Sequence, residues 1–252
     1  MNYEKWDEIL APYQHAVEEL KVKFKNIRKE FLTKGEYSPI EFVTGRTKKI
    51  ASIVSKAKRL NIQDIEAEME DIAGIRIMCQ FVEDIYNIVN LIKLRSDMTI
   101  VYEKDYIKNF KDSGYRSYHV IIKYPINSIA GSKEILCEIQ IRTLAMNFWA
   151  TIEHSLKYKY EHYIPETLAV RLRRAADAAF LLDQEMSEIR EDIMKAQVMY
   201  QVKSVTLRDV LDKIQELYNV GETHKAIKYQ RRLDKIDNER DITEILQLKK
   251  EI

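Results

Sequence analysis

The stretch EILCEIQIRT, residues 134–143, is the part of the chain that best indicates the fold, because its two faces follow different rules. As a strand, it directs one apolar row and one mostly polar row to opposite sides: Ile135, Cys137, Ile139 and Ile141 against Glu134, Leu136, Glu138, Gln140 and Arg142. The apolar row predicts packing under a helix. The polar row is typical either of an active-site floor or of the solvated face of an antiparallel strand.

The size and charge of the chain exclude several classes of protein. With 252 residues and 46% hydrophobic side chains, it can form one large domain or a domain with an appendage. The 41 basic and 40 acidic residues give no overall field that attracts nucleic acid or membrane, so any anion site must come from local clustering. The charged, amphipathic start and the lack of a long apolar run predict a cytoplasmic protein without membrane contact.

The cysteines and histidines do not form a metal motif. Cys79 and Cys137 lie in apolar, strand-like runs, where a buried thiol is favoured over a disulfide, a metal ligand or a nucleophile. Five scattered histidines give no zinc-type spacing. Only six glycines and four prolines interrupt the chain, which favours a helix-rich protein.

Apolar periodicity predicts the elements of the fold. Helices are expected at about residues 3–32, 47–60, 82–95, 144–163, 165–201, 206–220 and 222–237, the fourth capped by Thr143. Strands are expected at 72–81, 98–102, 117–124 and 134–143, with a loop at 104–113 and a hairpin-like connection at 125–133. The pattern changes after Ser204, so residues 204–252 form a candidate separate helical module.

Cations gather on one side of the helix expected at 47–60. Lys48, Ser52, Lys56 and Arg59 fall within a narrow arc, and Arg46 just precedes the helix. This row has the length of a triphosphate and contains no acid, although a solvated basic face is the plainer interpretation. Lys21, Lys25 and Arg28 share a face of the first helix, where a solvated face is again the default.

The strand 72–81 also carries residues that suggest chemistry. Asp71 lies at its beginning, a suitable position for binding a divalent ion, and Arg76 within it is costly unless paired or bound to a ligand. His119 shares a strand face with Ser117. Two carboxylates on neighbouring strands, facing cations, are suited to metal-dependent phosphoryl transfer. Neither a GxxxxGK[ST] loop nor a GxGxxG fingerprint is present.

Four segments in order carry a family resemblance: SPIEFVTGRTK, DIAGIRIMCQF, SGYRSYHVII and EIQIRTLAMNFWATIEHSLKYKY. Together they resemble the synthetase domain of RelA/SpoT homologues, and more narrowly the small alarmone synthetases of the RelQ type, over about residues 3–200. The resemblance implies an α+β, nucleotidyltransferase-like fold, in which helices flank a mixed β-sheet of about five strands and the terminal helices are long. It also implies transfer of the β,γ-pyrophosphate of ATP to the 3′-hydroxyl of GDP or GTP, which yields ppGpp or pppGpp and AMP.

The resemblance further implies roles for single residues. Arg46 and Arg76 would sandwich the adenine of ATP, and its phosphates would be held by Lys48, Ser52, Lys56 and Arg59. Asp71 and Glu138 would bind Mg²⁺, and Glu138 would also be the general base. The GDP or GTP site would comprise Lys111, Tyr115, His119, Gln140 and Asn147, with Tyr115 stacked on guanine and Arg142 in support.

Members of the RelQ type assemble as rings of four subunits whose central cleft binds the product pppGpp as an activator. The resemblance therefore implies a homotetramer in which six residues line that cleft: Lys21, Lys25, Arg28, Glu41, Phe42 and Thr44.

The chain departs from the family pattern in two respects. It has no His-Asp dipeptide of the kind found in alarmone hydrolase domains and no room for such a domain, so no alarmone hydrolysis is expected. The tail is longer than a minimal synthetase needs, which predicts a synthetase domain at 1–203 and a helical extension of unknown role at 204–252.

Two other functions remain open from the sequence. One is a catalytically inert regulator that binds nucleotides or single-stranded RNA in the same cationic cleft. The other is a nucleotidyltransferase acting on RNA, which would release pyrophosphate instead of AMP. The sequence does not distinguish GDP from GTP as the preferred acceptor.

Overall fold

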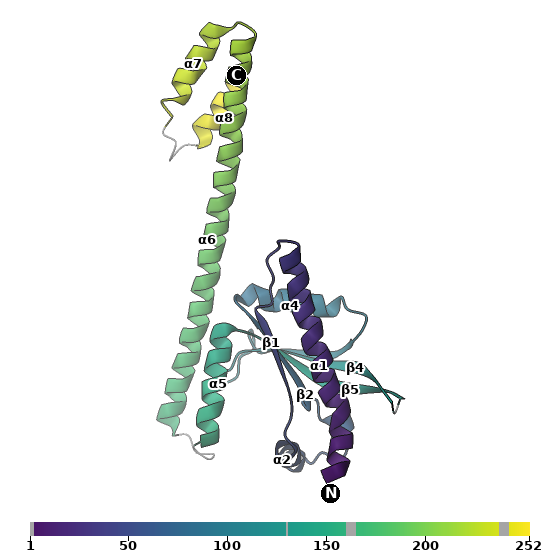
Figure 1. Ribbon diagram of the computed structural model, residues 1–252. Helices are drawn as coiled ribbons and strands as arrows, with labels where there is room; N and C mark the ends of the chain where they lie inside the picture. The colour runs from purple at the N-terminus through teal and green to yellow at the C-terminus, as the bar shows by residue number, and fades with distance from the viewer. Residues whose placement is uncertain (1–2, 130, 160–164, 237–241) are drawn as a thin grey trace. The chain divides into compact units, whose positions relative to one another are not determined.

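The computed structural model describes residues 3–129, 131–159, 165–236 and 242–252 (Figure 1). It divides into two compact units, Met1–Ser187 and Glu188–Ile252, which we describe separately.

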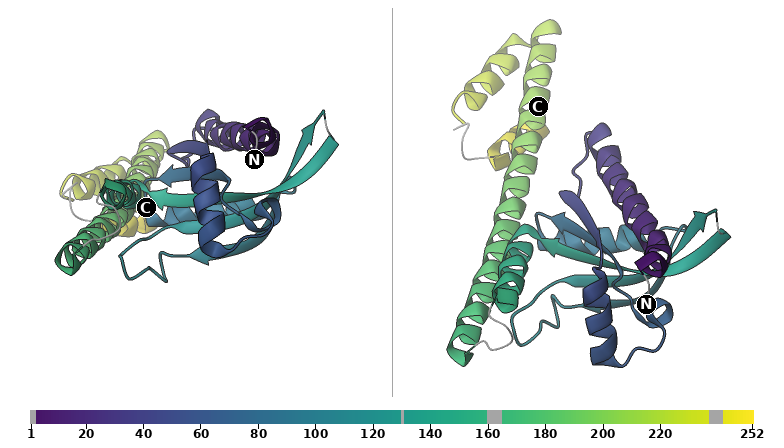
Figure 2. Two further views of the ribbon diagram at one scale, coloured as in Figure 1. Left: turned by 90° about the horizontal axis from the view of Figure 1, so that it is seen from below. Right: turned by 60° about the horizontal axis from the view of Figure 1, so that its bottom comes forward.

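The first unit is built on one mixed sheet. Its strands are β1 (Phe42–Thr47), β2 (Ala73–Cys79), β3 (Thr99–Asp105), β4 (Tyr118–Ser128) and β5 (Gly131–Thr143). Their order in the sheet is β1-β2-β5-β4-β3; β2 and β5 are parallel, and the other neighbours are antiparallel (Figures 1 and 2). The expected mixed α+β architecture with five strands is confirmed.

Helices cover the apolar side of this sheet. Helices α1 (Tyr3–Thr33) and α4 (Val82–Lys93) share one core with the inward row of β5, and α1 lies across the sheet in Figure 2. That row is Ile135, Cys137, Ile139 and Ile141, each at most 2% exposed. Helices α2 (Ile50–Leu60), α3 (Ile65–Glu68) and α5 (Leu144–Lys159) complete the unit together with the start of α6 (Glu166–Asn219). Alternation along β5 therefore leaves its polar row on the opposite face.

Thr143 connects the end of β5 to α5. Its Oγ1 accepts a hydrogen bond from the Met146 backbone N–H at 3.1 Å, so the expected helix cap is confirmed. The Thr143 hydroxyl in turn donates to Asp183 at 2.6 Å.

Strand β1 was not predicted from local sequence pattern. Residues 42–47 pair antiparallel with β2, and α2 begins only at Ile50 instead of near 47. Lys48 consequently precedes the helix and does not belong to its periodic arc. Pairing with β2 is a non-local interaction, which a helical pattern starting at residue 47 cannot reveal.

Strand ends also differ from the expectation. β3 continues to Asp105, and β4 and β5 extend to Ser128 and Gly131, so the hairpin connection is much shorter than residues 125–133. Gly131 adopts a φ of +105°, which favours glycine at this turn. Residues 160–163 of the predicted fourth helix, and residue 237 at the end of another, lie outside the described residues.

The second unit contains the end of α6 with α7 (Thr223–Leu233) and α8 (Ile242–Glu251). The predicted break near residue 204 is wrong, since α6 is continuous from Glu166 to Asn219. No glycine or proline interrupts that range, and the Thr206 hydroxyl bonds to the Val202 carbonyl at 2.8 Å within the helix. The three helices, with Ile236 just after α7, share a small core: Val210, Ile214, Ala226, Leu233, Ile236, Ile245 and Leu248.

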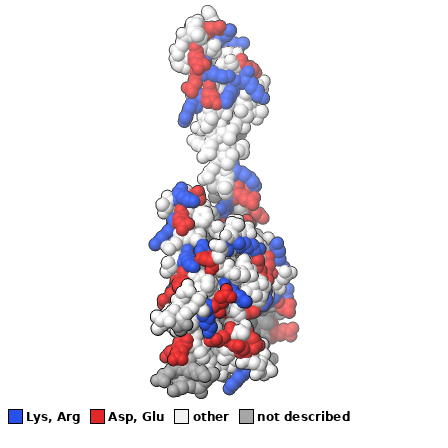
Figure 3. All heavy atoms as spheres, turned by 90° about the vertical axis from the view of Figure 1, so that its right-hand side faces the viewer, with Lys and Arg blue, Asp and Glu red and all other residues white. Residues whose placement is uncertain are grey.

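The surface carries both signs of charge. Figure 3 shows basic and acidic side chains interspersed on the face it presents, in agreement with the formal net charge of +1. None of the helices in the described ranges combines the length and apolar character that a membrane span requires.

Candidate active site

The polar row of β5 meets polar side chains of both neighbouring strands. The register pairs Gln140 with Arg76 of β2 on one side and with His119 of β4 on the other, while Glu138 lies opposite Gly74. Because paired residues direct their side chains to the same face, these groups share the side of the sheet away from α1 and α4.

Glu138 is the centre of a hydrogen-bonded group. Its Oε1 lies 2.8 Å from His119 Nδ1, and its Oε2 accepts from Gln140 Nε2 at 2.8 Å. Burial alone would raise the pKa of Glu138, but the His119 and Gln140 hydrogen bonds outweigh it and hold the pKa below its ordinary value. The carboxylate is therefore ionised at neutral pH and held by two donors.

Arg142 extends this group at the end of β5. Its Nη2 donates to Gln140 Oε1 at 2.8 Å and to the Tyr115 hydroxyl at 2.5 Å, and the Tyr115 oxygen lies 2.8 Å from His119 Nε2. Its Nε donates to Ser117 Oγ at 3.1 Å. Arg142 is only 4% exposed, so its charge acts in a region of weak screening.

A second carboxylate lies just before β2. Asp71 accepts from Lys48 Nζ at 2.7 Å and from Lys56 Nζ at 2.9 Å. Burial raises the pKa of Asp71, but the two lysine hydrogen bonds outweigh it, so the pKa is lowered overall. The negative charge of Asp71 also acts on Glu138, where it opposes ionisation. Two cations of the predicted basic row thus neutralise a carboxylate in this structure.

Arg76 presents an incompletely paired cation on the same face. Its Nη1 lies 3.5 Å from Asn147 Oδ1 of α5, and its buried Nε has no hydrogen-bond partner among the described residues. Burial lowers the pKa of Arg76, and the charges of Arg142 and Arg46 lower it further. Arg46, on β1, is exposed. It lies two residues from Thr44, which pairs with Arg76, so Arg46 and Arg76 point to the same face of the sheet.

The remaining predicted nucleotide-binding residues lie at the periphery. Lys111 Nζ stands 4.7 Å from the centre of the Tyr106 ring and 5.0 Å from that of Tyr115. Ser52 and Arg59 are exposed on α2, the helix that also supplies Lys56.

The six residues expected in an allosteric cleft lie on α1, on β1 and, for Glu41, directly before β1. Arg28 connects the two elements, because its Nε donates to the Ile40 carbonyl at 3.0 Å and its Nη2 lies 3.9 Å from Glu41. Lys21 and Lys25 belong to α1, and an added Cβ on Gly45 of β1 would meet Lys21. Phe42 and Thr44 alternate with Gly45 and therefore point to the other side of β1. The six side chains do not converge within one copy of the chain.

The two carboxylates fit a magnesium ion better than zinc or calcium. The described residues contain no group of three or more His, Cys, Asp or Glu side chains arranged for a metal. Mg²⁺ commonly takes one or two protein carboxylates and completes its shell with phosphate oxygens and water. Asp71 and Glu138 match that donor set.

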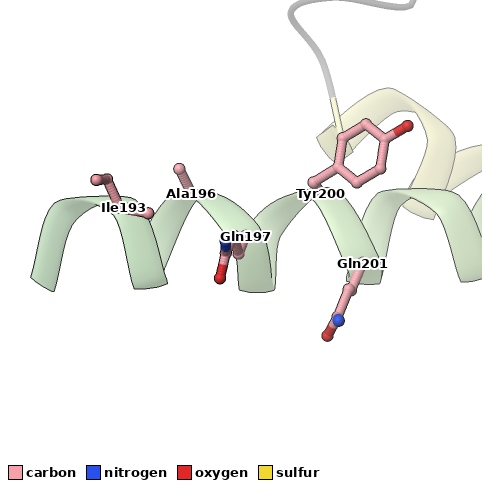
Figure 4. Close-up of a pocket in the computed structure, with 5 residues that line it drawn as sticks. All are labelled: Ile193, Ala196, Gln197, Tyr200 and Gln201. Carbon is pink, nitrogen blue, oxygen red and sulfur yellow. The ribbon is translucent and has the colours of Figure 1, made fainter. Parts of the chain in front are cut away.

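Two hollows elsewhere lack the chemistry of an active site. One, on α6, is lined by Ile193, Ala196, Gln197, Tyr200 and Gln201, none of them charged (Figure 4). The other lies between α5 and the beginning of α6 and is mostly apolar, with Phe148, Leu182 and Met186 among its walls.

Two residues of the site were missed as functional candidates. Ser117 Oγ accepts a hydrogen bond from Arg142 Nε, and the Tyr106 ring meets the His119 ring edge-on with centroids 5.1 Å apart. Ser117 could have been found from its shared face with His119. Tyr106 could not, because it lies in the stretch interpreted as a loop without periodicity.

Known proteins provide an independent comparison. Residues 45–163 match the family model described as "Region found in RelA / SpoT proteins". The chain is 54% identical over 204 residues to GTP pyrophosphokinase YjbM of Bacillus subtilis (strain 168). That match covers 97% of the relative and 81% of this chain, so about a fifth of the chain lies outside it.

Solved structures that resemble this chain come from the same group of proteins as its sequence relatives. Small alarmone synthetase 1 of Bacillus subtilis, bound to its product pppGpp, matches with a TM-score of 0.73 and 56% identity, covering 75% of this chain and 98% of that one. The same synthetase bound to AMPCPP matches with a TM-score of 0.68 and 51% identity, covering 76% and 99%. The chain therefore belongs to the RelA/SpoT family and, within it, to the small alarmone synthetases, a group of pyrophosphokinases.

Proposed function

We propose that the protein transfers the β,γ-pyrophosphate of ATP to the 3′-hydroxyl of GDP or GTP and so produces ppGpp or pppGpp together with AMP. The observation that carries this proposal is Glu138, an ionised carboxylate held by two donors. It shares a sheet face with Arg76 and Arg142, and it lies close enough to Asp71 for that charge to act on it. The related synthetase bound to pppGpp and to AMPCPP supports the same pair of nucleotides.

The residues of the chain suit the steps of this reaction. Glu138 accepts the proton of the attacking 3′-hydroxyl, since both its oxygens retain a lone pair beside their present donors. Lys48 and Lys56 exchange Asp71 for the ATP phosphates, and Ser52 and Arg59 extend that contact along α2. Mg²⁺, held by Asp71 and Glu138, would neutralise charge that develops on the transferred group.

The nucleotide bases are assigned to the planar groups of the site. Arg46 and Arg76 stack on adenine, for which the planar guanidinium group is suited; the Nε of Arg76 is buried and has no hydrogen-bond partner among the described residues. Tyr115 stacks on guanine, and Lys111 and His119 contact the phosphates of the acceptor nucleotide. Gln140 and Asn147 form hydrogen bonds with polar groups of that nucleotide.

The test is a nucleotide assay with ATP, GDP and Mg²⁺ that compares wild type with Glu138→Gln. AMP and ppGpp should form together in wild type and disappear in the variant. Glu134→Gln removes an exposed carboxylate from the same strand and should remain active. Wild type that binds nucleotides but forms neither product would favour the inert regulator, and pyrophosphate in place of AMP would favour a nucleotidyltransferase.

We also propose that the protein assembles as a homotetramer and is activated by pppGpp. The placement of Phe42 and Thr44 on the side of β1 away from Lys21 supports this, because a pocket that contains all six side chains would need residues from another copy. Lys25→Glu should lose the activation by added pppGpp while keeping basal synthesis. Full activation of that variant would contradict the assignment. The same assay, supplied with ppGpp and Mn²⁺, should reveal no hydrolysis.

A further inference from the structure

The segment 110–116, which lies between β3 and β4, is anchored to the beginning of α6 by Arg116. The Arg116 guanidinium contacts two aromatic rings, because its Cζ lies 4.5 Å from the ring centres of both Phe110 and Phe180. Phe110 belongs to the segment and Phe180 to α6. One cation therefore joins the segment to the helix through both rings.

The same guanidinium donates hydrogen bonds to the segment and to the helix. Its Nη1 donates to the Gly114 carbonyl at 3.1 Å and to the Ala176 carbonyl at 3.4 Å, and its Nη2 donates to Asp177 at 3.0 Å. Ala176 and Asp177 belong to α6. Arg116 is only 7% exposed, so water competes weakly for these bonds.

The backbone of the segment lies directly against α6 at Gly114. This residue has a φ of +85°, and an added Cβ would lie 2.6 Å from the Cβ of Ala176 and 3.5 Å from the Arg173 carbonyl oxygen. Only a residue without a side chain can approach the helix so closely. The contact between the segment and α6 is therefore specific.

The anchor also determines where Lys111 lies. Gly114, which accepts from Arg116, donates its N–H to the Lys111 carbonyl at 2.7 Å, and the Lys111 N–H donates to the Tyr115 carbonyl at 3.3 Å. Lys111 also directly follows Phe110. Among the described residues, no hydrogen bond other than those of Arg116 joins the segment to α6.

Tyr115 has a second attachment. Its hydroxyl bonds to Arg142 and lies 2.8 Å from His119 Nε2, so the end of its ring is held by β4 and β5. These contacts do not fix the backbone of residues 110–114. Loss of the Arg116 guanidinium would therefore release the turn that carries Lys111 while the Tyr115 hydroxyl keeps its partners.

We infer that Arg116 is a positioning residue for the acceptor nucleotide: it anchors the segment 110–116 to α6 and so holds Lys111 and Tyr115 in place before GDP or GTP binds. The identity of the ligand rests on the proposed function. Arg116 acts through the segment, since it is nearly inaccessible and both its Nη atoms donate to protein oxygens. If the anchored form falls from nearly all molecules to about a tenth, the apparent affinity for the acceptor falls about tenfold.

Steady-state kinetics with each nucleotide varied in turn test this role. Arg116→Gln should raise the KM for GDP about tenfold, while the KM for ATP, and kcat at saturating GDP, stay within about twofold of wild type. ATP is spared because its proposed contacts come from α2, β1 and β2. An unchanged KM for GDP, an equal rise for both nucleotides, or a fall in kcat alone would overturn the inference.

Phe180→Leu tests the anchor from the side of the helix. Phe180 lies outside the proposed nucleotide site, yet its ring contacts Arg116. This variant should raise the KM for GDP selectively, by a smaller factor than Arg116→Gln. Should Arg116→Gln fail to fold, Phe180→Leu decides, and an unchanged KM for GDP there would overturn the inference.

Arg95→Gln is the matched control. Arg95 is also paired with an aspartate, since it donates to Asp97 at 2.6 and 2.7 Å, and Asp97 accepts in addition from Lys23 of α1. None of these three residues belongs to the segment or to the proposed nucleotide site. Loss of this pair should lower stability without changing either KM.

Hydrogen exchange and binding assays make the outcome independent of turnover. The peptide that covers residues 106–117 should exchange faster in Arg116→Gln than in wild type or Arg95→Gln, and saturating GDP should restore its protection. Equal exchange in Arg116→Gln and wild type would overturn the anchor. Calorimetry with GDP alone separates the two failures. A wild type that binds GDP without forming product contradicts the proposed function, and the GDP affinity of Arg116→Gln still decides the inference; a wild type that does not bind GDP overturns both.

Discussion

Asp183 illustrates how one buried residue makes stability depend on pH. It is 4% exposed and accepts from Thr143 at 2.6 Å, and burial raises its pKa to about 6, with the nearby charge of Glu83 adding to the effect. The folded state therefore holds this proton more tightly than the unfolded state, whose aspartate titrates near pH ~4. Stability should fall as the pH rises from about 4 through about 6, because ionisation of buried Asp183 is unfavourable.

Asp183→Asn should remove that dependence. An amide oxygen can still accept from Thr143, so we expect the variant to match wild type near pH 4.5 and to exceed it at pH 8 by on the order of 2 kcal/mol. Urea unfolding at both pH values measures the difference. Asp177→Asn, on the same helix, breaks an ion pair with Arg116 and should instead lower stability. An Asp183→Asn protein less stable than wild type at pH 8 would contradict this account.

Single residues of the site were predictable to different degrees. A period of two along residues 134–143 placed Glu138, Gln140 and Arg142 on one face, and the structure agrees. The contact between Arg142 and Tyr115 could not be predicted, because it depends on the register of β4 against β5. The pairing of Lys48 with Asp71 was missed for a similar reason: the expected helix began too early, and charge pattern does not show which carboxylate lies across the fold.

At the scale of elements, the contact between α1 and β1 depends on Gly45. A Cβ at this position would lie 2.9 Å from Ile75 Cδ1 and from Val17 Cγ1, closer than side chains normally pack. The absence of a side chain therefore lets the helix lie directly on the edge strand.

Gly45→Ala should destabilise the protein by about 1–3 kcal/mol through overpacking, measured by urea unfolding. Gly74→Ala is the matched control on the adjacent strand, where an added Cβ would meet its nearest atom, the Arg46 carbonyl oxygen, at 3.6 Å. That contact is ordinary, so the control should stay close to wild type. Equal stability of both variants would show that α1 shifts at no cost.

Elements were predicted best where the pattern is long and local. Helices α1 and α4 and strands β2 and β5 lie where apolar periodicity placed them, within a few residues. Strand β1 is short and contains a glycine, and pairing with β2 defines it. The break expected in α6 was wrong because a change of composition at residue 204 does not end a helix that lacks glycine and proline.

At the scale of the whole molecule, we propose that residues 1–203 form the synthetase domain and 204–252 the extension. The extension contains its own core from α6, α7 and α8, which supports independent packing. A chain that ends at Lys203 should form AMP from ATP and GDP at a rate close to that of the full chain. Loss of synthesis in a shortened protein that still folds, judged by circular dichroism, would assign the extension a part in catalysis.

The parallel pairing of β2 with β5 has a consequence for how the molecule acquires its activity. Asp71 and Glu138 come together only when these two strands meet, and α4, β3 and β4 lie between them in the chain. Helices form from local contacts in microseconds, whereas such long-range pairing must first close a large loop. During refolding from denaturant, the helical signal should therefore return well before the first AMP appears, and a nascent chain would remain catalytically silent until β5 is in place.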